Sequence, residues 1–556
     1  MRAAATVVAL GAGVTLAGAG PAVAGEAAAQ AGATQSGAAQ TGATQSGAAQ
    51  VGRVAGVDWK ACSAATLTGV PADQVKLYSC ARYRVPVDHD DATLGTIDIA
   101  LLKRAAKEPA KRIGSLFLNP GGPGGSGLRM PIAGAGYFQP PVLDRFDLIG
   151  FDPRGVGASN PLRCFTTAED ASEVMDSMAA VPRTRAEISA TLAAYKDYGQ
   201  FCKNNAGALL NHMSTKDVVR DLDQLRAAVG DQKLSYVGFS YGTLIGSTYA
   251  AMFPKQTRAI VIDGNVDPQL RTTDGVTYDL QRAQGFEISL DAFLKRCDQA
   301  GDRCAFSSGD PRAKFDELRE YLKDQPIQLP GQAQKLDLGA FVGGVSSALY
   351  SPAGFASLAE DLQKAYDVIH PLAAQPQGVA PGGLKVLGPG KNGHVDLAPD
   401  SPYTGDDSYF GVNCADKPMR ISQAQVPGIA GQADRQSPTF GRYQVFSDIA
   451  GCPVWPSAKK SDRYSGPWHA STDVPVVVVS NLYDPATQYA FGRKMAAELG
   501  NSRLLSVDSF GHCILGRALG VDQAVAGYLT DLTVPAEGQV FQPNTQPFQA
   551  ARTAQG

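Results

Sequence analysis

The chain has 556 residues, a formal net charge of −3 at pH 7 and a pI near 6.1. This balance leaves no basic surplus with which to bind nucleic acid, so that class of partner is not expected. The length is too great for one compact core and suits one large domain with an insertion, or two domains. A hydrophobic fraction of 44% is ordinary for a soluble globular protein.

The N-terminus has the features of a secretory signal peptide over residues 1–24. Arg2 supplies a positive charge, an apolar stretch follows at 3–17, and the small-x-small pattern at 22–24 predicts cleavage after Ala24. An uncleaved anchor helix is the alternative, but its Ala and Gly content is weakly hydrophobic for a bilayer. We therefore expect a secreted, extracellular protein with no stable membrane association.

A low-complexity tract follows the signal peptide. The nine residues GATQSGAAQ at 32–40 recur unchanged at 42–50. Such a composition cannot bury apolar area. Residues 25–53 are therefore predicted to be a linker or pro-segment.

Nine cysteines fit an oxidising compartment. Their spacings resemble no zinc module, so no metal site is expected. The odd count leaves at least one thiol, for which Cys513 is the candidate. Proximity in the sequence suggests four disulfides without proving their connectivity, namely Cys62/Cys80, Cys164/Cys202, Cys297/Cys304 and Cys414/Cys452.

The first ordered half of the chain alternates between predicted strands and helices. The helical periodicity at 217–229, with a capping-box pattern at its start, predicts a helix between two of the apolar strands. Such alternation predicts an α/β fold with a mainly parallel, doubly wound sheet. The expected strands in this half are 82–87, 96–102, 113–118, 146–151, 234–237 and 259–262.

The alternation stops after residue 262, and the next apolar strand is 474–479, about 210 residues further on. A strand–helix–strand crossover needs only a few tens of residues, so the interval must hold an inserted, mostly helical cap. Amphipathic stretches at 286–295 and 312–322 support helices there, and a last core strand is expected at 503–507. The predicted divisions are a signal peptide (1–24), a linker or pro-segment (25–53), a first core part (54–265), a cap insertion (266–470), a second core part (471–535) and a loosely held polar tail (536–556).

The most informative motif is Gly238-Phe239-Ser240-Tyr241-Gly242, between the strand at 234–237 and an apolar helix at 244–252. A G-x-S-x-G pentapeptide at a strand-to-helix turn is typical of the nucleophile elbow of α/β-hydrolases. The turn is tight enough to need glycine at its flanking positions. Ser240 is therefore the predicted nucleophile.

A serine nucleophile needs a base, and the base needs an orienting acid. In this fold the chain order is serine, acid, histidine. His512 follows the last predicted strand and is the expected base, while the other five histidines are interpreted as surface or core residues. Asp484 follows the strand at 474–479 and is the expected acid, with helix capping as its alternative role. Asp263 is the rival acid, although we expect it to shape the exit into the cap.

Two motifs follow the strands that precede the elbow. Two N–H donors must stabilise the oxyanion, and we expect them to be the N–H groups of Tyr241 and Gly122, the latter in the sequence NPGGPGGSG at 119–127. Phosphate binding by this loop is disfavoured, because it lacks the lysine and the G-x-G-x-x-G helix start. Asp152 and Arg154, in FDPRGVGAS, could be catalytic but are expected to form a buried ion pair under the site.

Together these motifs resemble the secreted actinobacterial tripeptidyl aminopeptidases, relatives of proline iminopeptidase within the α/β-hydrolase serine peptidases. The resemblance implies an α/β-hydrolase fold with a cap, a signal peptide, and release of short peptides from free N-termini. Gln488 departs from the family, which usually has proline after DPxT. The segment VNCAD at 412–416 resembles the segment that returns from the cap, which makes Asp416 a candidate for binding the substrate ammonium, with a plain surface aspartate as the alternative.

The sequence thus predicts a secreted serine exopeptidase that releases short peptides, tripeptides by resemblance, through an acyl-enzyme intermediate. Its partners would be peptide or protein N-termini, and no cofactor is required. A secreted carboxylesterase acting on small esters would use the same three residues and is the main alternative. A binding module on an inactive scaffold is disfavoured, because no member of the triad is missing.

Overall fold

The computed structural model describes residues 56–549, apart from 330–331, 333, 372–386, 388–400 and 457–462. These residues all belong to one compact unit, Val54–Gly556. The predicted signal peptide and low-complexity tract lie outside the described residues, as does His394.

A central sheet organises the described part of the chain. It has nine strands in the order β1-β2-β4-β3-β5-β6-β7-β8-β9. The pairs β1–β2 and β2–β4 are antiparallel, and all the other neighbours are parallel, as the sequence predicted. The strands are β1 (Tyr78–Pro86), β2 (Thr96–Arg104), β3 (Gly114–Asn119), β4 (Phe146–Phe151), β5 (Leu234–Phe239), β6 (Thr257–Asp263), β7 (Val476–Tyr483), β8 (Ser502–Phe510) and β9 (Val540–Phe541).

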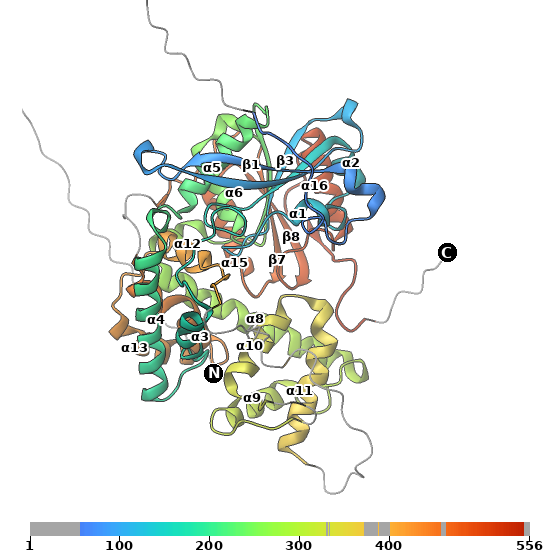
Figure 1. Cartoon of the computed structure of the whole chain (residues 1–556). Coiled ribbons are helices and arrows are strands. Elements are labelled where there is room, and N and C mark those ends of the chain that lie inside the picture. Colours follow the sequence, from blue (N-terminus) through green and yellow to red (C-terminus); the bar gives the residue numbers. More distant parts are fainter. Residues whose placement is uncertain are drawn as a thin grey trace, which may run out of the picture. The chain divides into compact units, whose positions relative to one another are not determined.

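Helices cover both faces of the sheet (Figure 1). Successive strand residues point to opposite faces, so Tyr236 of β5 packs into one core and its neighbour Val237 into another. The first core also receives α5 (Thr215–Ala228), α6 (Gly242–Met252) and α15 (Tyr489–Leu499). The second receives α2 (Pro140–Arg145) and α16 (Leu519–Asp531), with α1 (Met130–Ala133) beside them. This is the doubly wound arrangement expected from the sequence.

The long interval between β6 and β7 is helical. Helices α8 to α11 form a separate apolar core around the rings of Phe293, Phe315 and Phe341, and Figure 1 shows them grouped below the sheet. Phe510, at the end of β8, also packs into this core. The helices of the interval are α7 (Pro268–Thr273), α8 (Gly275–Ala300), α9 (Pro311–Leu322), α10 (Leu338–Leu349), α11 (Phe355–Ile369), α12 (Ser408–Asp416), α13 (Val426–Gln436) and α14 (Gly441–Gln444).

A second helical excursion leaves the sheet between β4 and α5. It contains α3 (Ala168–Asp176) and α4 (Arg185–Asn205), and the Gln423 amide, just before α13, donates to the Leu192 carbonyl of α4 at 2.6 Å. Its tyrosines contact the interval between β6 and β7: the Tyr195 hydroxyl donates to the Phe446 carbonyl at 2.5 Å, and the Tyr198 hydroxyl to Asp407 at 2.5 Å. The sequence analysis did not separate this excursion from the core.

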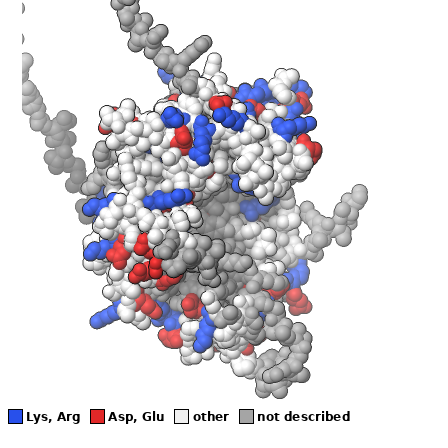
Figure 2. All heavy atoms as spheres, in the orientation of Figure 1, with Lys and Arg blue, Asp and Glu red and all other residues white. Residues whose placement is uncertain are grey.

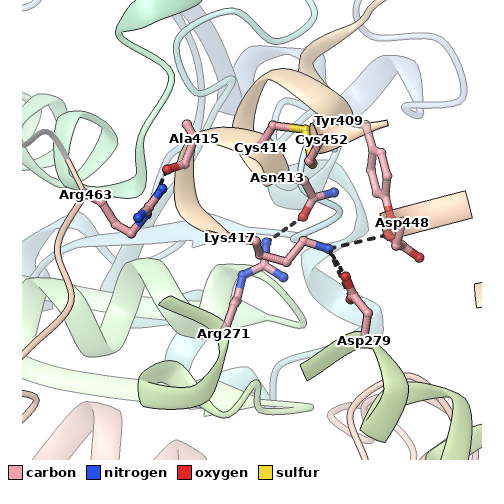
Figure 3. The surroundings of a disulfide bond; sticks show 10 residues. All are labelled: Arg271, Asp279, Tyr409, Asn413, Cys414, Ala415, Lys417, Asp448, Cys452 and Arg463. Atoms are coloured by element: carbon pink, nitrogen blue, oxygen red, sulfur yellow. Dashed lines mark hydrogen bonds and ion pairs between the residues drawn. A yellow bond between two sulfur atoms is a disulfide. The ribbon is translucent and has the colours of Figure 1, made fainter. Parts of the chain in front are cut away.

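The four proposed cysteine pairs are all disulfides, and Cys513 is the free cysteine of the described residues. The Cys414–Cys452 bond joins α12 to the end of the interval (Figure 3). None of the helices in the described ranges combines the length and the apolar composition that a membrane span requires.

The C-terminal tail is not loosely held, and that prediction is wrong for residues 540–549. Strand β9 pairs in parallel with β8 and buries Phe541 at the otherwise open edge of the sheet. The Asn544 N–H donates to the Arg517 carbonyl at 2.8 Å. The ring of Phe548 lies 6.2 Å from that of Phe293 in α8. A few apolar residues in the polar tail therefore hold it against both the central sheet, through β9, and the helical interval, through Phe548.

Charged residues of both signs are interspersed on the face shown in Figure 2. This distribution agrees with the small formal net charge of −3. The visible face therefore carries no broad basic field of the kind that binds nucleic acid.

Candidate active site

Ser240 lies in a tight turn between β5 and α6. Its φ is +56°, a left-handed conformation that a serine adopts only when its surroundings impose it. The Ser240 N–H donates to the Asp263 carbonyl at 2.9 Å, and the Thr243 hydroxyl donates to the Ser240 carbonyl at 2.6 Å. A Cβ on Gly238 would stand 2.3 Å from the Gly242 carbonyl oxygen, so the flanking glycines are required sterically. The motif therefore forms the elbow predicted from the sequence.

His512 and Asp484 lie in contact after β8 and β7. The imidazole Nδ1 is 2.9 and 3.0 Å from the two oxygens of the Asp484 carboxylate. This contact places the ring proton on Nδ1 and leaves Nε2 as an acceptor. Nε2 is buried and has no hydrogen-bond partner among the described residues, so it is free to take a proton from a nucleophile.

Two further residues fix this pair. The Thr487 hydroxyl lies 3.0 Å from Asp484 Oδ2 and 3.2 Å from His512 Nδ1. Tyr350, which follows α10, accepts a hydrogen bond from the His512 N–H at 2.9 Å and sets its ring edge-on against the imidazole, with centroids 5.3 Å apart. Neither residue was among those predicted from the sequence, and Tyr350 has no local signal because its contact uses the backbone carbonyl.

Asp263, the rival acid, binds backbone and not the imidazole. Its Oδ2 accepts hydrogen bonds from the N–H groups of Ile514 and Leu515 at 2.7 and 2.9 Å. Burial raises the pKa of Asp263 to about 6. Asp263 thus supports the loop that carries His512, in addition to marking the exit from β6.

The glycine-rich loop after β3 meets the elbow closely. Gly122, Ser240 and Tyr241 line one small cavity, which brings the two expected N–H donors together with the serine. Asn119 Oδ1 accepts from the Gly121 N–H at 2.9 Å and closes the turn. A Cβ on Gly121, whose φ is +90°, would lie 2.3 Å from the Phe239 carbonyl oxygen. The approach of loop to elbow therefore depends on the absence of a side chain there.

The predicted ion pair between Asp152 and Arg154 is wrong. Arg154 forms a bidentate pair with Asp221 of α5, at 2.7 and 2.6 Å. Asp152 needs no cation, because its oxygens accept from Ser126, Gly127 and Ala158 instead. Asp152 therefore anchors the glycine-rich loop, and Arg154 braces α5 against the N-terminal strands.

The cavity beside Ser240 is small, about 40 Å³. Both arginines of its lining come from the interval between β6 and β7. Among the described residues that line it, none is a carboxylate. The lining consists of Gly122, Pro123, Ser240, Tyr241, Val266, Arg271, Tyr278, Arg282, Tyr350, Tyr409, Asn413, Ala486 and Thr487.

Acidic residues lie behind this lining in a buried charge cluster (Figure 3). The Lys417 ammonium is 2.8 Å from Asp279 and 3.7 Å from Asp448. Arg282 is 3.2 Å from Asp448, and the Tyr409 hydroxyl donates to the same carboxylate. The charges of these groups therefore compensate one another without a ligand.

Asp416 is 1% exposed, so the alternative of a plain surface aspartate is wrong. Its two oxygens accept from the N–H and the hydroxyl of Thr215 at 3.0 and 2.6 Å, and that hydroxyl lies 2.5 Å from the Tyr241 hydroxyl. Burial raises the pKa of the Asp416 carboxyl. Asp416 thus stands behind Tyr241 and outside the lining of the cavity.

Comparisons with known proteins agree with this geometry. Residues 114–302 match the model of the alpha/beta hydrolase fold, and residues 437–541 match that of the TAP-like proteins. The chain is 31% identical over 516 residues to the serine protease Hip1 of Mycobacterium tuberculosis, covering 87% of this chain and 90% of that one. It is 29% identical to the tripeptidyl aminopeptidase of Streptomyces lividans, covering 83% and 82%. It is 31% identical to carboxylesterase B of Mycobacterium tuberculosis, covering 86% and 88%.

Proposed function

This chain belongs to the α/β-hydrolase family and is a serine hydrolase, and on that premise we propose that it is a secreted exopeptidase that releases short peptides from free N-termini. Tripeptides are the proposed products, because a tripeptidyl aminopeptidase is among its relatives. The contact of His512 Nδ1 with both oxygens of Asp484 is the observation that carries the proposal, since it orients a base in the position where the fold requires one.

In the proposed mechanism, Ser240 Oγ attacks the scissile carbonyl carbon while His512 Nε2 takes the hydroxyl proton. The N–H groups of Tyr241 and Gly122 stabilise the oxyanion that forms. The C–N bond then breaks, and His512 gives its proton to the departing amine. Water attacks the acyl-enzyme with His512 again as base, which releases the peptide acid and regenerates Ser240. Asp484 holds the imidazole in the required tautomer throughout.

The proposed cap, residues 266–470, would limit how much of a chain enters the cleft. Tyr350 follows α10 of this cap and its carbonyl accepts from the His512 N–H, so the cap contacts the loop that carries the proposed base. The substrate ammonium would then bind within the cap. Asp416 could bind it only if the hydrogen bonds from Thr215 to the Asp416 carboxylate broke first. The signal peptide at 1–24 is proposed to direct secretion, and four disulfides support an oxidising destination.

The proposal is tested by comparing hydrolysis of a free tripeptide anilide with that of its N-acetylated twin. A strong preference for the free amine is expected. Equal cleavage would contradict the exopeptidase assignment and indicate an endopeptidase. N-terminal sequencing of the secreted protein tests the proposed cleavage after Ala24, and an intact Met1 would contradict it.

A secreted carboxylesterase is the second candidate. The cavity beside Ser240 has no carboxylate among its described lining residues, which is the observation in its favour. It would use the same triad, and a carboxylesterase is among the relatives. Turnover of small esters with no cleavage of either anilide would select this alternative.

A further inference from the structure

Both cations that line the cavity beside Ser240 come from helices after β6. Arg271 belongs to α7 and Arg282 to α8, and they share the lining with Asn413 of α12. An arginine that faces a catalytic cavity is either neutralised by its neighbours or available to a substrate. The hydrogen bonds of each group distinguish these two cases.

Arg271 and Asn413 hold each other but leave donors unused. The Arg271 Nη2 donates to Asn413 Oδ1 at 2.7 Å, a contact drawn in Figure 3. The two residues are 3% and 2% exposed. Arg271 Nε and Asn413 Nδ2 are buried without a hydrogen-bond partner among the described residues. Buried donors are nearly always paired in native proteins, so two orphans in one catalytic cavity indicate a missing acceptor.

The guanidinium of Arg271 is also held in place by aromatic rings. Its Cζ lies 5.5 Å from the centroid of the Tyr241 ring and 5.4 Å from that of Tyr278. Both tyrosines line the same cavity. The cation is therefore preorganised, so a ligand need not order it on binding.

The carboxylates near these cations are already bound by other groups. Asp416 is bound by Thr215, Asp279 by Lys417, and Asp448 by Arg282 and Lys417. Arg282 is thus paired, and Arg271 is the cation considered for a ligand. None of the three carboxylates lines the cavity, whereas Arg271 and Arg282 do. The described lining beside Ser240 therefore contains arginines and no carboxylate.

We propose that this cavity is a subsite for a short anionic side chain, that of an aspartate, on the residue whose carbonyl Ser240 attacks. The proposal rests on the proposed function of Ser240 as nucleophile. The carboxylate would accept hydrogen bonds from Arg271 Nε and Asn413 Nδ2. The cavity is small, so the shorter of the two acidic side chains is the one proposed.

We assign this subsite to the acyl side of the scissile bond. Arg271 packs against the ring of Tyr241, the residue that follows the proposed nucleophile and whose N–H is proposed to bind the oxyanion. The leaving amine must reach His512 Nε2, because His512 protonates it. The anilide comparison tests this assignment, since the residue on the acyl side carries the tested side chain.

The test uses two tripeptide anilides with free N-termini, Ala-Ala-Asp and Ala-Ala-Asn, which differ only in charge at the tested side chain. For the unmodified protein we expect kcat/KM to be at least tenfold higher for the aspartate substrate. A site that pairs a substrate group by hydrogen bonds rejects the analogue that cannot supply them. The matched glutamate and glutamine pair should show a smaller ratio, because the cavity is small.

Arg271→Gln should reduce the aspartate-to-asparagine ratio to below threefold. Arg303→Gln is the matched control, since Arg303 is exposed on the cap, and it should keep the ratio of the unmodified protein. Near-ultraviolet circular dichroism verifies the fold of each variant, and the substrate comparison in the unmodified protein needs no variant at all.

The outcomes separate the two proposals. Turnover of both anilides at equal rates, or a preference for asparagine, overturns the anionic subsite and leaves the hydrolase function standing. Turnover that survives Ser240→Ala overturns the function assigned to Ser240, and the subsite with it. No turnover of any anilide or simple ester by the unmodified protein likewise overturns both.

Discussion

Replacing Asp263 by asparagine should remove a specific pH dependence from the stability of this fold. Burial raises the pKa of Asp263 to about 6 from its ordinary value of 3.8. The folded state therefore binds more protons at this site than the unfolded state between about pH 4 and pH 6. The free energy of unfolding then falls as the pH rises through this window, and the stability that the protonated carboxyl contributes is lost above pH 6.

The difference between the two pKa values corresponds to about 3 kcal/mol. This figure needs no reduction for solvent screening, because Asp263 is 0% exposed. Asparagine does not ionise, and its Oδ1 can still accept from the N–H groups of Ile514 and Leu515, which both bind one oxygen of Asp263. The advantage of Asp263 over asparagine should therefore shrink by about 2 kcal/mol between pH 4 and pH 7.5, because the unfolded carboxyl is already partly ionised at pH 4.

Urea unfolding of the two proteins at these two pH values measures this change directly. Asp73→Asn is a suitable control, because Asp73 is exposed and its replacement should give nearly the same difference at both pH values. A free-energy difference between the original protein and Asp263→Asn that is the same at pH 4 and pH 7.5 would refute the reasoning.

Ser240→Ala should lower kcat/KM for anilides and esters by on the order of 10³-fold or more, because the proposed nucleophile is lost. Asp484→Asn should lower kcat by about 10³-fold to 10⁴-fold, since the asparagine amide would no longer hold the His512 imidazole in its Nδ1–H tautomer. The melting temperature should change little. Gly121→Ala should lower kcat about 10²-fold, because the new Cβ would stand 2.3 Å from the Phe239 carbonyl oxygen and move the loop that carries Gly122. Phe541→Ala should cost about 3 kcal/mol in urea unfolding, whereas Val540→Ala beside it, 56% exposed, should cost little.

Much of the sheet could be predicted from the sequence, because buried parallel strands are short apolar runs with turn residues at their ends. Strand β4 has the bounds that were expected, and β3, β5 and β6 differ from expectation by one or two residues at an end. The elbow was equally predictable, since its conformation depends on five consecutive residues. The apolar runs and the elbow motif are both local patterns, and so they can be recognised without any knowledge of the fold.

The parts that could not be predicted depend on contacts between distant segments. Arg154 pairs with Asp221, 67 residues away, and no pattern within the FDPRGVGAS motif distinguishes that partner from Asp152. Arg271 meets Asn413 across 142 residues of the cap. The polar tail contains too few apolar residues to predict a strand from the sequence. In the structure, the open edge of β8 pairs with two residues of the tail, and this pairing forms β9.

The cap of this enzyme is connected to the proposed catalytic residues through backbone atoms. The Tyr350 carbonyl accepts from the N–H of His512, and Arg282 donates to the Ala486 carbonyl at 3.4 Å, two residues after Asp484. A movement of α8 or of the end of α10 would therefore displace the segments that carry the base and the acid. The same helix α8 supplies Arg282 to the cavity beside Ser240. Because one helix contacts both the cavity beside Ser240 and the loop of the proposed acid, binding energy gained at the cavity could order the proposed triad for the chemical step.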